Sequence, residues 1–286
     1  MAFEHKVAAR VFSTVIGFFA AVGFVTIGGG IEANADENLP AVDGLNGKIT
    51  YTNSIDGSDI SMFSGSIAVP LGHSFGLQID GAFMPDISVE GLGDSSLYGV
   101  GAHAFWRDPN RGLLGLVGHI SHADFLDGIQ FYTAAVESEK YWDQLSLENF
   151  VGFTKVDFRD ADFLSRSTLA YYPIDNLQFY VGHFHAHGFH GLRLGSEWSL
   201  GSRAGATPAI YADAAIIEGG HTSITAGARV YFGQSDKSLI RRHREDDPIN
   251  LASWLDAVWY DLGMTNYPSP AGYFRNLPIA GHLRDE

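Results

Sequence analysis

The feature that most constrains this chain is a regular alternation of apolar and polar residues over residues 43–233. It recurs in segments of roughly ten residues, the length of a tilted β-strand that crosses a bilayer. Successive side chains of a strand point to opposite faces, so each segment has one apolar face. Within residues 45–53, for example, Ile49 lies on one face and Lys48 on the other. The alternation therefore predicts β-strands, each with one apolar face.

About twelve such strands are predicted, and an even count returns both ends of the sheet to one side. The expected ranges are 45–53, 62–69, 75–83, 95–106, 113–123, 129–139, 144–154, 163–172, 177–185, 191–200, 207–217 and 222–232. Turn-forming residues fill the connections 70–73, 108–111 and 173–176, while the longest connection, 85–94, is expected outside the cell. The predicted fold class is all-β, a transmembrane antiparallel up-and-down β-barrel.

Composition excludes several other classes of protein. A hydrophobic content of 45% with 34 Gly, 20 Phe and 12 Tyr favours many short strands over a bundle of membrane helices. A net charge of −15 argues against nucleic acid as a partner, because a phosphate backbone attracts clustered Lys and Arg. The absence of Cys excludes a disulfide framework and any thiolate site.

The polar faces of the strands carry too many charges for a dry interior. A soluble sandwich or lipocalin-like barrel would also alternate, but it would bury its apolar faces and expose its charges. We therefore expect the charged face to line a wet lumen and the apolar face to contact outer-membrane lipid. The lumen-lining candidates are Lys48, Asp80, Glu148, Arg193, Glu197, Asp213 and Arg229.

The first 35 residues have the three parts of a secretory signal peptide. A basic start with Lys6 and Arg10 precedes an apolar run over residues 11–27, and the small residues Ala33 and Ala35 then form a cleavage site. An uncleaved membrane anchor is the alternative interpretation. Cleavage after Ala35 would leave a short linker, 36–42, before the barrel at 43–233, and the exported chain is expected in the bacterial outer membrane.

The last predicted strand resembles the assembly signal of bacterial outer-membrane barrels. Thr225, Gly227, Val230 and Phe232 occupy its polar, glycine and two apolar or aromatic positions. Residues 98–101 with 105–109, and residues 238–248, look like motifs of uncharacterised porin-like outer-membrane proteins of alphaproteobacteria. The resemblance implies location and fold, with the barrel assembly machinery as a partner, and it brings no known substrate or cofactor.

The alternation ends at Gly233, and residues 234–286 form a polar C-terminal extension expected in the periplasm. A short amphipathic helix is expected over residues 249–262, with Trp254 and Trp259 on its apolar side. One interpretation is a disordered tail. The other is a peg that docks on the barrel mouth or on an envelope partner.

Few residues suggest chemistry. His183, His185 and His187 alternate along one strand, a weak candidate for a metal site, although no acidic residue lies beside them. The pairs His119 with Ser121 and His221 with Ser223 are compatible with a hydrolase but are expected by chance. The pair Gly99 and Gly101 is expected to leave room for lumen side chains. No metal, cofactor or enzymatic activity is therefore predicted.

Two functional classes fit such a barrel. The leading prediction is a porin-like barrel for passive diffusion of small hydrophilic solutes, with mixed charges across the passage selecting by size and charge. The alternative is a non-conducting barrel with a structural or surface-interaction role, since wide aqueous channels usually need about sixteen strands.

Overall fold

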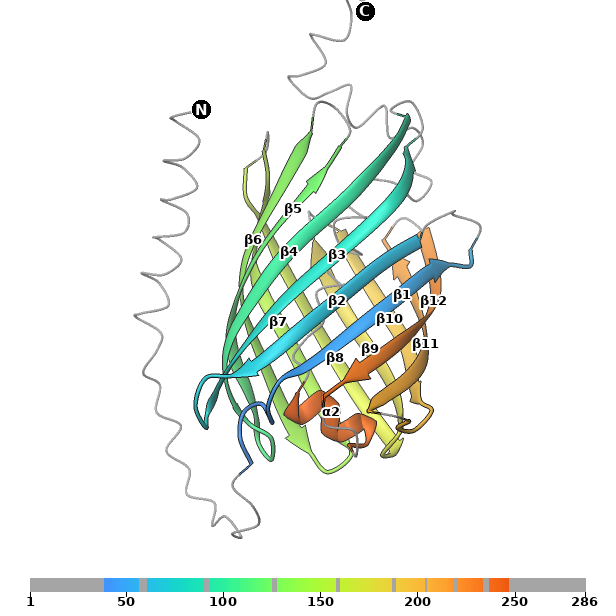
Figure 1. Ribbon diagram of the computed structural model, residues 1–286. Coiled ribbons are helices and arrows are strands. Elements are labelled where there is room, and N and C mark those ends of the chain that lie inside the picture. The colour runs from blue at the N-terminus through green and yellow to red at the C-terminus, as the bar shows by residue number, and fades with distance from the viewer. Residues whose placement is uncertain are drawn as a thin grey trace, which may run out of the picture. The chain divides into compact units, whose positions relative to one another are not determined.

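A computed structural model of the chain describes residues 39–56, 61–89, 93–124, 128–157, 160–186, 189–203, 205–218, 221–233 and 237–246. These residues form a closed barrel of twelve antiparallel strands, in which each strand pairs with its neighbours in sequence and the last pairs with the first. Figure 1 shows the tilted strands, with a short helix at the lower end of the barrel. The predicted all-β, up-and-down barrel is confirmed.

Each range expected from the alternation overlaps one strand of the barrel. The strands are β1 (Asn46–Ser54), β2 (Ser61–Pro70), β3 (Phe75–Val89), β4 (Gly93–Asp108), β5 (Gly112–Ala123), β6 (Ile129–Trp142), β7 (Leu145–Val156), β8 (Asp162–Ile174), β9 (Leu177–Ala186), β10 (Phe189–Ser199), β11 (Ala206–Ile217) and β12 (His221–Phe232). The helix is α2 (Leu239–Glu245).

The expected long connection over residues 85–94 is wrong. β3 continues to Val89 and β4 already begins at Gly93. The pairing of β3 with β4 shifts in register between Met84 and Ile87, on either side of Pro85. Proline lacks an N–H to donate to a ladder, and such an irregularity is where a sheet accommodates it.

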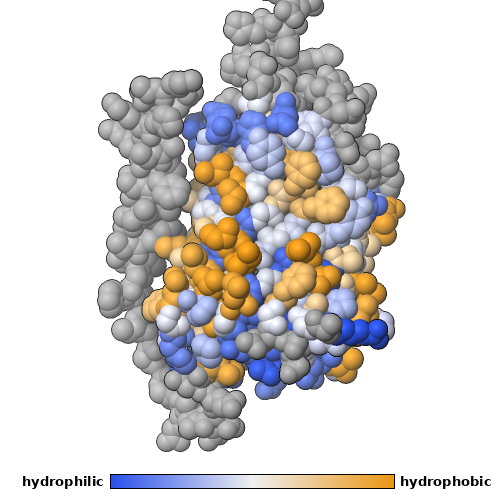
Figure 2. Space-filling view, viewed as in Figure 1, coloured by the Kyte–Doolittle hydropathy of each residue, from blue (hydrophilic) through white to orange (hydrophobic). Residues whose placement is uncertain are grey.

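The two faces of the barrel wall differ in the way the alternation predicts. On β1, Ile49 and Tyr51 are exposed, whereas Lys48 and Thr50 are buried toward the interior. Figure 2 shows apolar side chains gathered over the middle of the wall, with hydrophilic residues toward both ends. A barrel with an apolar exterior and a polar interior has the architecture of outer-membrane barrels.

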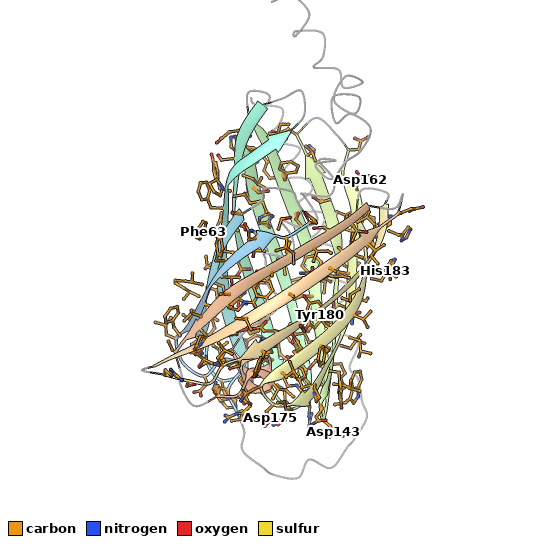
Figure 3. The ribbon with its side chains drawn as sticks, turned by 90° about the vertical axis from the view of Figure 1, so that its right-hand side faces the viewer. Phe63, Asp143, Asp162, Asp175, Tyr180 and His183 are labelled. Carbon is orange, nitrogen blue, oxygen red and sulfur yellow. The ribbon has the colours of Figure 1, made fainter. Side chains whose placement is uncertain are left out.

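We name the two ends of the barrel by their connections. The end that carries the start of β1 and the end of β12 has four connections of two to four residues, at 71–74, 109–111, 143–144 and 175–176, and we call it the turn end. The opposite end, the loop end, has three connections of similar length, at 90–92, 187–188 and 218–220, and three longer ones. Figure 3 shows Asp143 and Asp175 at the turn end and Asp162 toward the loop end. Tight turns face the periplasm in bacterial barrels.

Among the described residues, no helix is both long enough and apolar enough to cross a membrane.

Candidate functional site in the barrel interior

All seven charged residues expected to line the lumen lie on the inward phase of their strands. Lys48, Asp80, Glu197 and Asp213 are buried, and Glu148, Arg193 and Arg229 are partly buried. The opposite charges among them do not all face one another across a passage, because two of the acid–base pairs lie along one side of the wall. That side is formed by β9–β12 together with β1.

The first of these pairs joins β10 to β11. Arg193 Nε lies 2.8 Å from Asp213 Oδ2, and the hydroxyl of Tyr180 donates to the same carboxylate oxygen. The guanidinium of Arg193 also lies 5.7 Å from the centre of the Tyr180 ring, within the range of a cation–π contact. A base, an acid and an aromatic ring therefore form one unit on this side of the interior.

The second pair lies nearer the turn end. Arg229 forms an ion pair with Glu197, and Arg229 Nε donates to Thr50 Oγ1 at 3.0 Å. The hydroxyl of Tyr231 donates to the other oxygen of Glu197. These charge-assisted hydrogen bonds fix the side chains from β12, β10 and β1 relative to one another.

The opposite side, which we call the acidic wall, is the inward face of β3–β6. His103 Nε2 lies 2.7 Å from Asp80 Oδ2, and His103 Nδ1 lies 3.0 Å from Glu137 Oε2. Gln78 Nε2 donates to Asp80 Oδ1 at 2.7 Å. All four side chains are completely or almost completely buried. Two carboxylates thus share one imidazole.

The acidic wall also contains buried polar atoms without a hydrogen-bond partner. They are Gln78 Oε1, Glu137 Oε1, both ring nitrogens of His119, Ser121 Oγ, and Nε and Nη2 of Arg107. A buried polar atom without a partner costs about 1–3 kcal/mol, so water or a solute is expected to satisfy such a group. This wall is therefore one part of the interior where a polar occupant is expected.

Helix α2 lies inside the opening of the barrel at the turn end, the turn-end mouth. Its first residues, Leu239 and Ile240, pack in an apolar cluster with Ala170, Tyr172, Ala209, Tyr231 and partly buried Tyr180. The backbone N–H of Ile240 donates to the carbonyl of Asp175, and that of Leu239 donates to Asn176 Oδ1. An isolated helix of this length is unstable in water, so α2 depends on these contacts with the barrel.

The rest of α2 binds the wall through polar side chains. His243 lies between two tyrosine hydroxyls, with Nδ1 2.8 Å from that of Tyr172 and Nε2 2.9 Å from that of Tyr231. Arg242 Nη2 donates to Thr207 Oγ1 at 2.9 Å, and Arg244 Nη2 donates to the Leu145 carbonyl at 2.8 Å. The expectation of a disordered tail therefore does not hold for residues 237–246. The helix expected over residues 249–262 lies outside the described residues.

The chain preceding β1 enters the same mouth from the other side. Ala41 and Val42 have no exposed surface, and Val42 packs with Ala68, Phe105 and Leu113. The N–H of Ala41 donates to the His73 carbonyl at 2.7 Å, and Arg107 Nη1 donates to the Ala41 carbonyl at 3.2 Å. Both ends of the described chain thus occupy the turn-end mouth.

The two segments are joined by a cluster of charges around buried Lys237, in which Asp43 is half exposed. Lys237 Nζ lies 2.7 Å from Asp246 Oδ1, 3.0 Å from Glu245 Oε2 and 3.2 Å from Asp43 Oδ2. Asn46 Nδ2 donates to Asp246 Oδ1 at 3.0 Å. Burial raises the pKa of Asp246 from 3.8 to about 6, although Lys237 opposes this shift.

The candidate metal ligands face outward rather than into the interior. His183 and His185 of β9 lie beside His190 of β10, with 3.2 Å between His183 Nε2 and His190 Nδ1. His187 lies outside the described residues. Within the part of the chain that the structure describes, no group of three or more side chains is arranged to hold a metal ion.

The remaining chemical candidates show no catalytic arrangement. His119 and Ser121 are both buried on β5, but neither side chain has a hydrogen-bond partner, so they do not bond each other. The side chain of His221 is outside the described set. A methyl group placed on Gly99 would lie 2.8 Å from His119 Nε2, so Gly99 does leave room for a lumen side chain.

The proposed assembly residues lie in the strand that closes the barrel. Thr225, Gly227, Val230 and Phe232 are all on β12, which pairs with β1 from Gly47–Phe232 onward. Their role in assembly stays a prediction. The predicted signal peptide and its cleavage residues, Ala33 and Ala35, lie outside the described residues.

Sequence reasoning missed His103 and Glu137 in the interior and His243 in the mouth. His103 is in phase with Gly99 and Gly101 on β4, and Glu137 is in phase with Thr133 on β6. Residues of one phase share a face of their strand, so the sequence pattern could have placed both side chains inside the barrel. Nothing in the alternation shows that they meet, because it does not fix the relative height of distant strands.

The chain matches no family model and no curated protein. Among solved structures, it is similar to the KdgM porin in complex with disordered oligogalacturonate, at 9% identity and a TM-score of 0.46 over 66% of this chain and 99% of that one. An outer membrane channel from Pseudomonas putida F1 matches at 13% identity and 0.47, over 71% and 99%. Outer membrane phospholipase A from Escherichia coli matches at 12% and 0.43, over 71% and 95%. Two are channels and one is an enzyme.

Proposed function

We propose that the protein is a porin-like barrel of the bacterial outer membrane that lets small hydrophilic solutes diffuse passively. The observation that carries this proposal is the polar, charged interior enclosed by an apolar exterior. Charges are expensive to bury in a dry protein, and a wet lumen removes that cost. Outer-membrane lipid would contact the exterior, and small polar solutes would contact the acidic wall.

The arrangement of the turn-end mouth supports a closed state of this pore. The segment before β1 and helix α2 lie in the mouth, and Lys237 joins them through Asp43 and Asp246. Neither segment is part of the barrel ladder, so either can leave without breaking strand pairing. Diffusion would then require α2 to move out of the mouth.

A permeation measurement tests this proposal. Leu239 has no exposed surface and packs against the barrel interior; Leu239→Asp places a charge there and is expected to release α2. Liposomes containing the purified full-length variant should swell in isotonic solutions of small sugars faster than liposomes with the wild-type protein. Leu71→Asp is the matched control, because it introduces the same charge at an exposed leucine in the β2–β3 turn, at the same end of the barrel.

A non-conducting structural barrel is the second candidate, and the closed mouth with its paired interior charges favours it. In that case Leu239→Asp would give no swelling although the barrel remains folded, as shown by its altered gel mobility before and after heating. Neither candidate is an enzyme. His119 and Ser121 do not bond each other, which argues against that pair as a catalytic dyad.

A further inference from the structure

The two sides of the interior differ in how their carboxylates are paired. On the β9–β12 side, Arg193 has Asp213 and Arg229 has Glu197 at ion-pair distance. On the acidic wall, Asp80 and Glu137 share the single imidazole of His103. Even a doubly protonated imidazole carries one positive charge, so this group of three keeps at least one net negative charge while both carboxyls are ionised.

Arg107, the basic residue of the acidic wall, does not pair with that group, since its Nε and Nη2 have no hydrogen-bond partner. Arg107 lies at the turn-end mouth, where it donates to the Ala41 carbonyl. In the strand register, Arg107 and Glu139 both lie opposite Leu113, one on each neighbouring strand. The positive charge of Arg107 therefore has the carboxylate of Glu139 nearby. The group of Asp80, His103 and Glu137 lies further inside the barrel.

Unpartnered polar atoms adjoin this group. Glu137 Oε1 and Gln78 Oε1 are buried without a hydrogen-bond donor. His119 is 3% exposed, has no partner on either ring nitrogen, and stands opposite Asp80 across Gly101, which has no side chain to fill the space between them. Acceptors beside these two carboxylates attract a cation or its hydration water, and they repel anions.

We propose that the acidic wall contains a binding site for small hydrophilic cations, centred on Asp80 and Glu137, which makes the pore favour cations over anions. This inference rests on the proposed pore and names the class of solute that it would pass. The site does not require α2, since its residues belong to β3–β6.

The test is the reversal potential across a planar bilayer that separates two KCl concentrations. The purified full-length Leu239→Asp protein serves as the open background. Potassium should be more permeant than chloride, and adding Asp80→Asn with Glu137→Gln should lower the K⁺/Cl⁻ permeability ratio by about threefold or more. Asp160→Asn, an exposed change in the β7–β8 connection, is the control and should leave the ratio unchanged.

The outcomes separate the two proposals. Absence of any conductance contradicts the pore itself. Conductance that prefers chloride, or a preference unaffected by the two substitutions, overturns the cation site and leaves the pore intact. If the double variant does not fold, Glu137→Gln alone serves, because an amide of the same shape can still accept the hydrogen bond from His103.

Discussion

Asp246 is the residue at which the closing segments of the mouth meet the wall. Its carboxylate accepts hydrogen bonds from Lys237 and from Asn46 of β1. Glu245 and Asp43 also face Lys237, so one ammonium group lies at ion-pair distance from three carboxylates. Burial of the Asp246 carboxylate disfavours its charged form and so favours taking up a proton; the nearby Glu245 adds to this effect and Lys237 opposes it.

The strength of closure should therefore depend on pH. The pKa of Asp246 rises from 3.8 to about 6 in the docked state, so the docked form binds the proton more tightly than a released segment. The corresponding stabilisation, at most about 3 kcal/mol, is complete below pH 4 and is lost as the pH rises through 6. The wild-type pore should open less often at pH 5 than at pH 7.5 in bilayer recordings.

Asp246→Asn provides the control for that measurement. The amide keeps an oxygen for Asn46 and Lys237 but cannot titrate over this range. Its open fraction should change much less between the two pH values. An equal pH dependence in wild type and variant would show that another group controls closure.

The strands form where apolar and polar residues alternate, whereas helix α2 forms because it docks on the barrel. Period-two alternation determines which face of a strand is apolar, and that face was predicted along β1, β3 and β12. Helix α2 has only seven residues and two buried apolar ones at its start, too short a pattern to recognise as a helix. Its position follows from contacts to Tyr172 and Tyr231, which sequence spacing does not reveal.

The exterior of the strands provides a prediction that separates a membrane barrel from a soluble one. Val181 lies in the middle of β9 and is 53% exposed on the outer face. Val181→Arg should lower the free energy of unfolding in lipid vesicles by about 2–4 kcal/mol, because an arginine at the bilayer centre is poorly solvated. Urea titration with tryptophan fluorescence measures this difference.

Leu71→Arg is the matched substitution at the membrane edge. Leu71 is similarly exposed but lies in the β2–β3 turn. Its effect should be no more than about 1 kcal/mol, as for positions near the interface. Equal and small effects of both substitutions would indicate a barrel whose exterior faces water.

For the whole molecule, the sequence predicted the sheet much better than the interior. Alternation places Asp80 and Arg229 inside, but it cannot show that Asp80 meets His103 or that Arg229 meets Glu197, because those contacts depend on strand register and tilt. Pro85 misled the prediction of a loop, since a turn-forming residue was instead accommodated within β3. The contacts that fill the mouth could not be predicted from the sequence, because they join residues about 200 positions apart.

In the proposed pore, a polar lumen crosses the membrane and α2 closes it at the turn end. Single-channel conductance of the full-length protein in a planar bilayer, compared between wild type and Leu239→Asp, tests this directly. We expect rare openings in the wild type and stable, long-lived conducting steps of the same barrel in the variant. A folded variant that never conducts would show that the barrel is not a pore closed by α2.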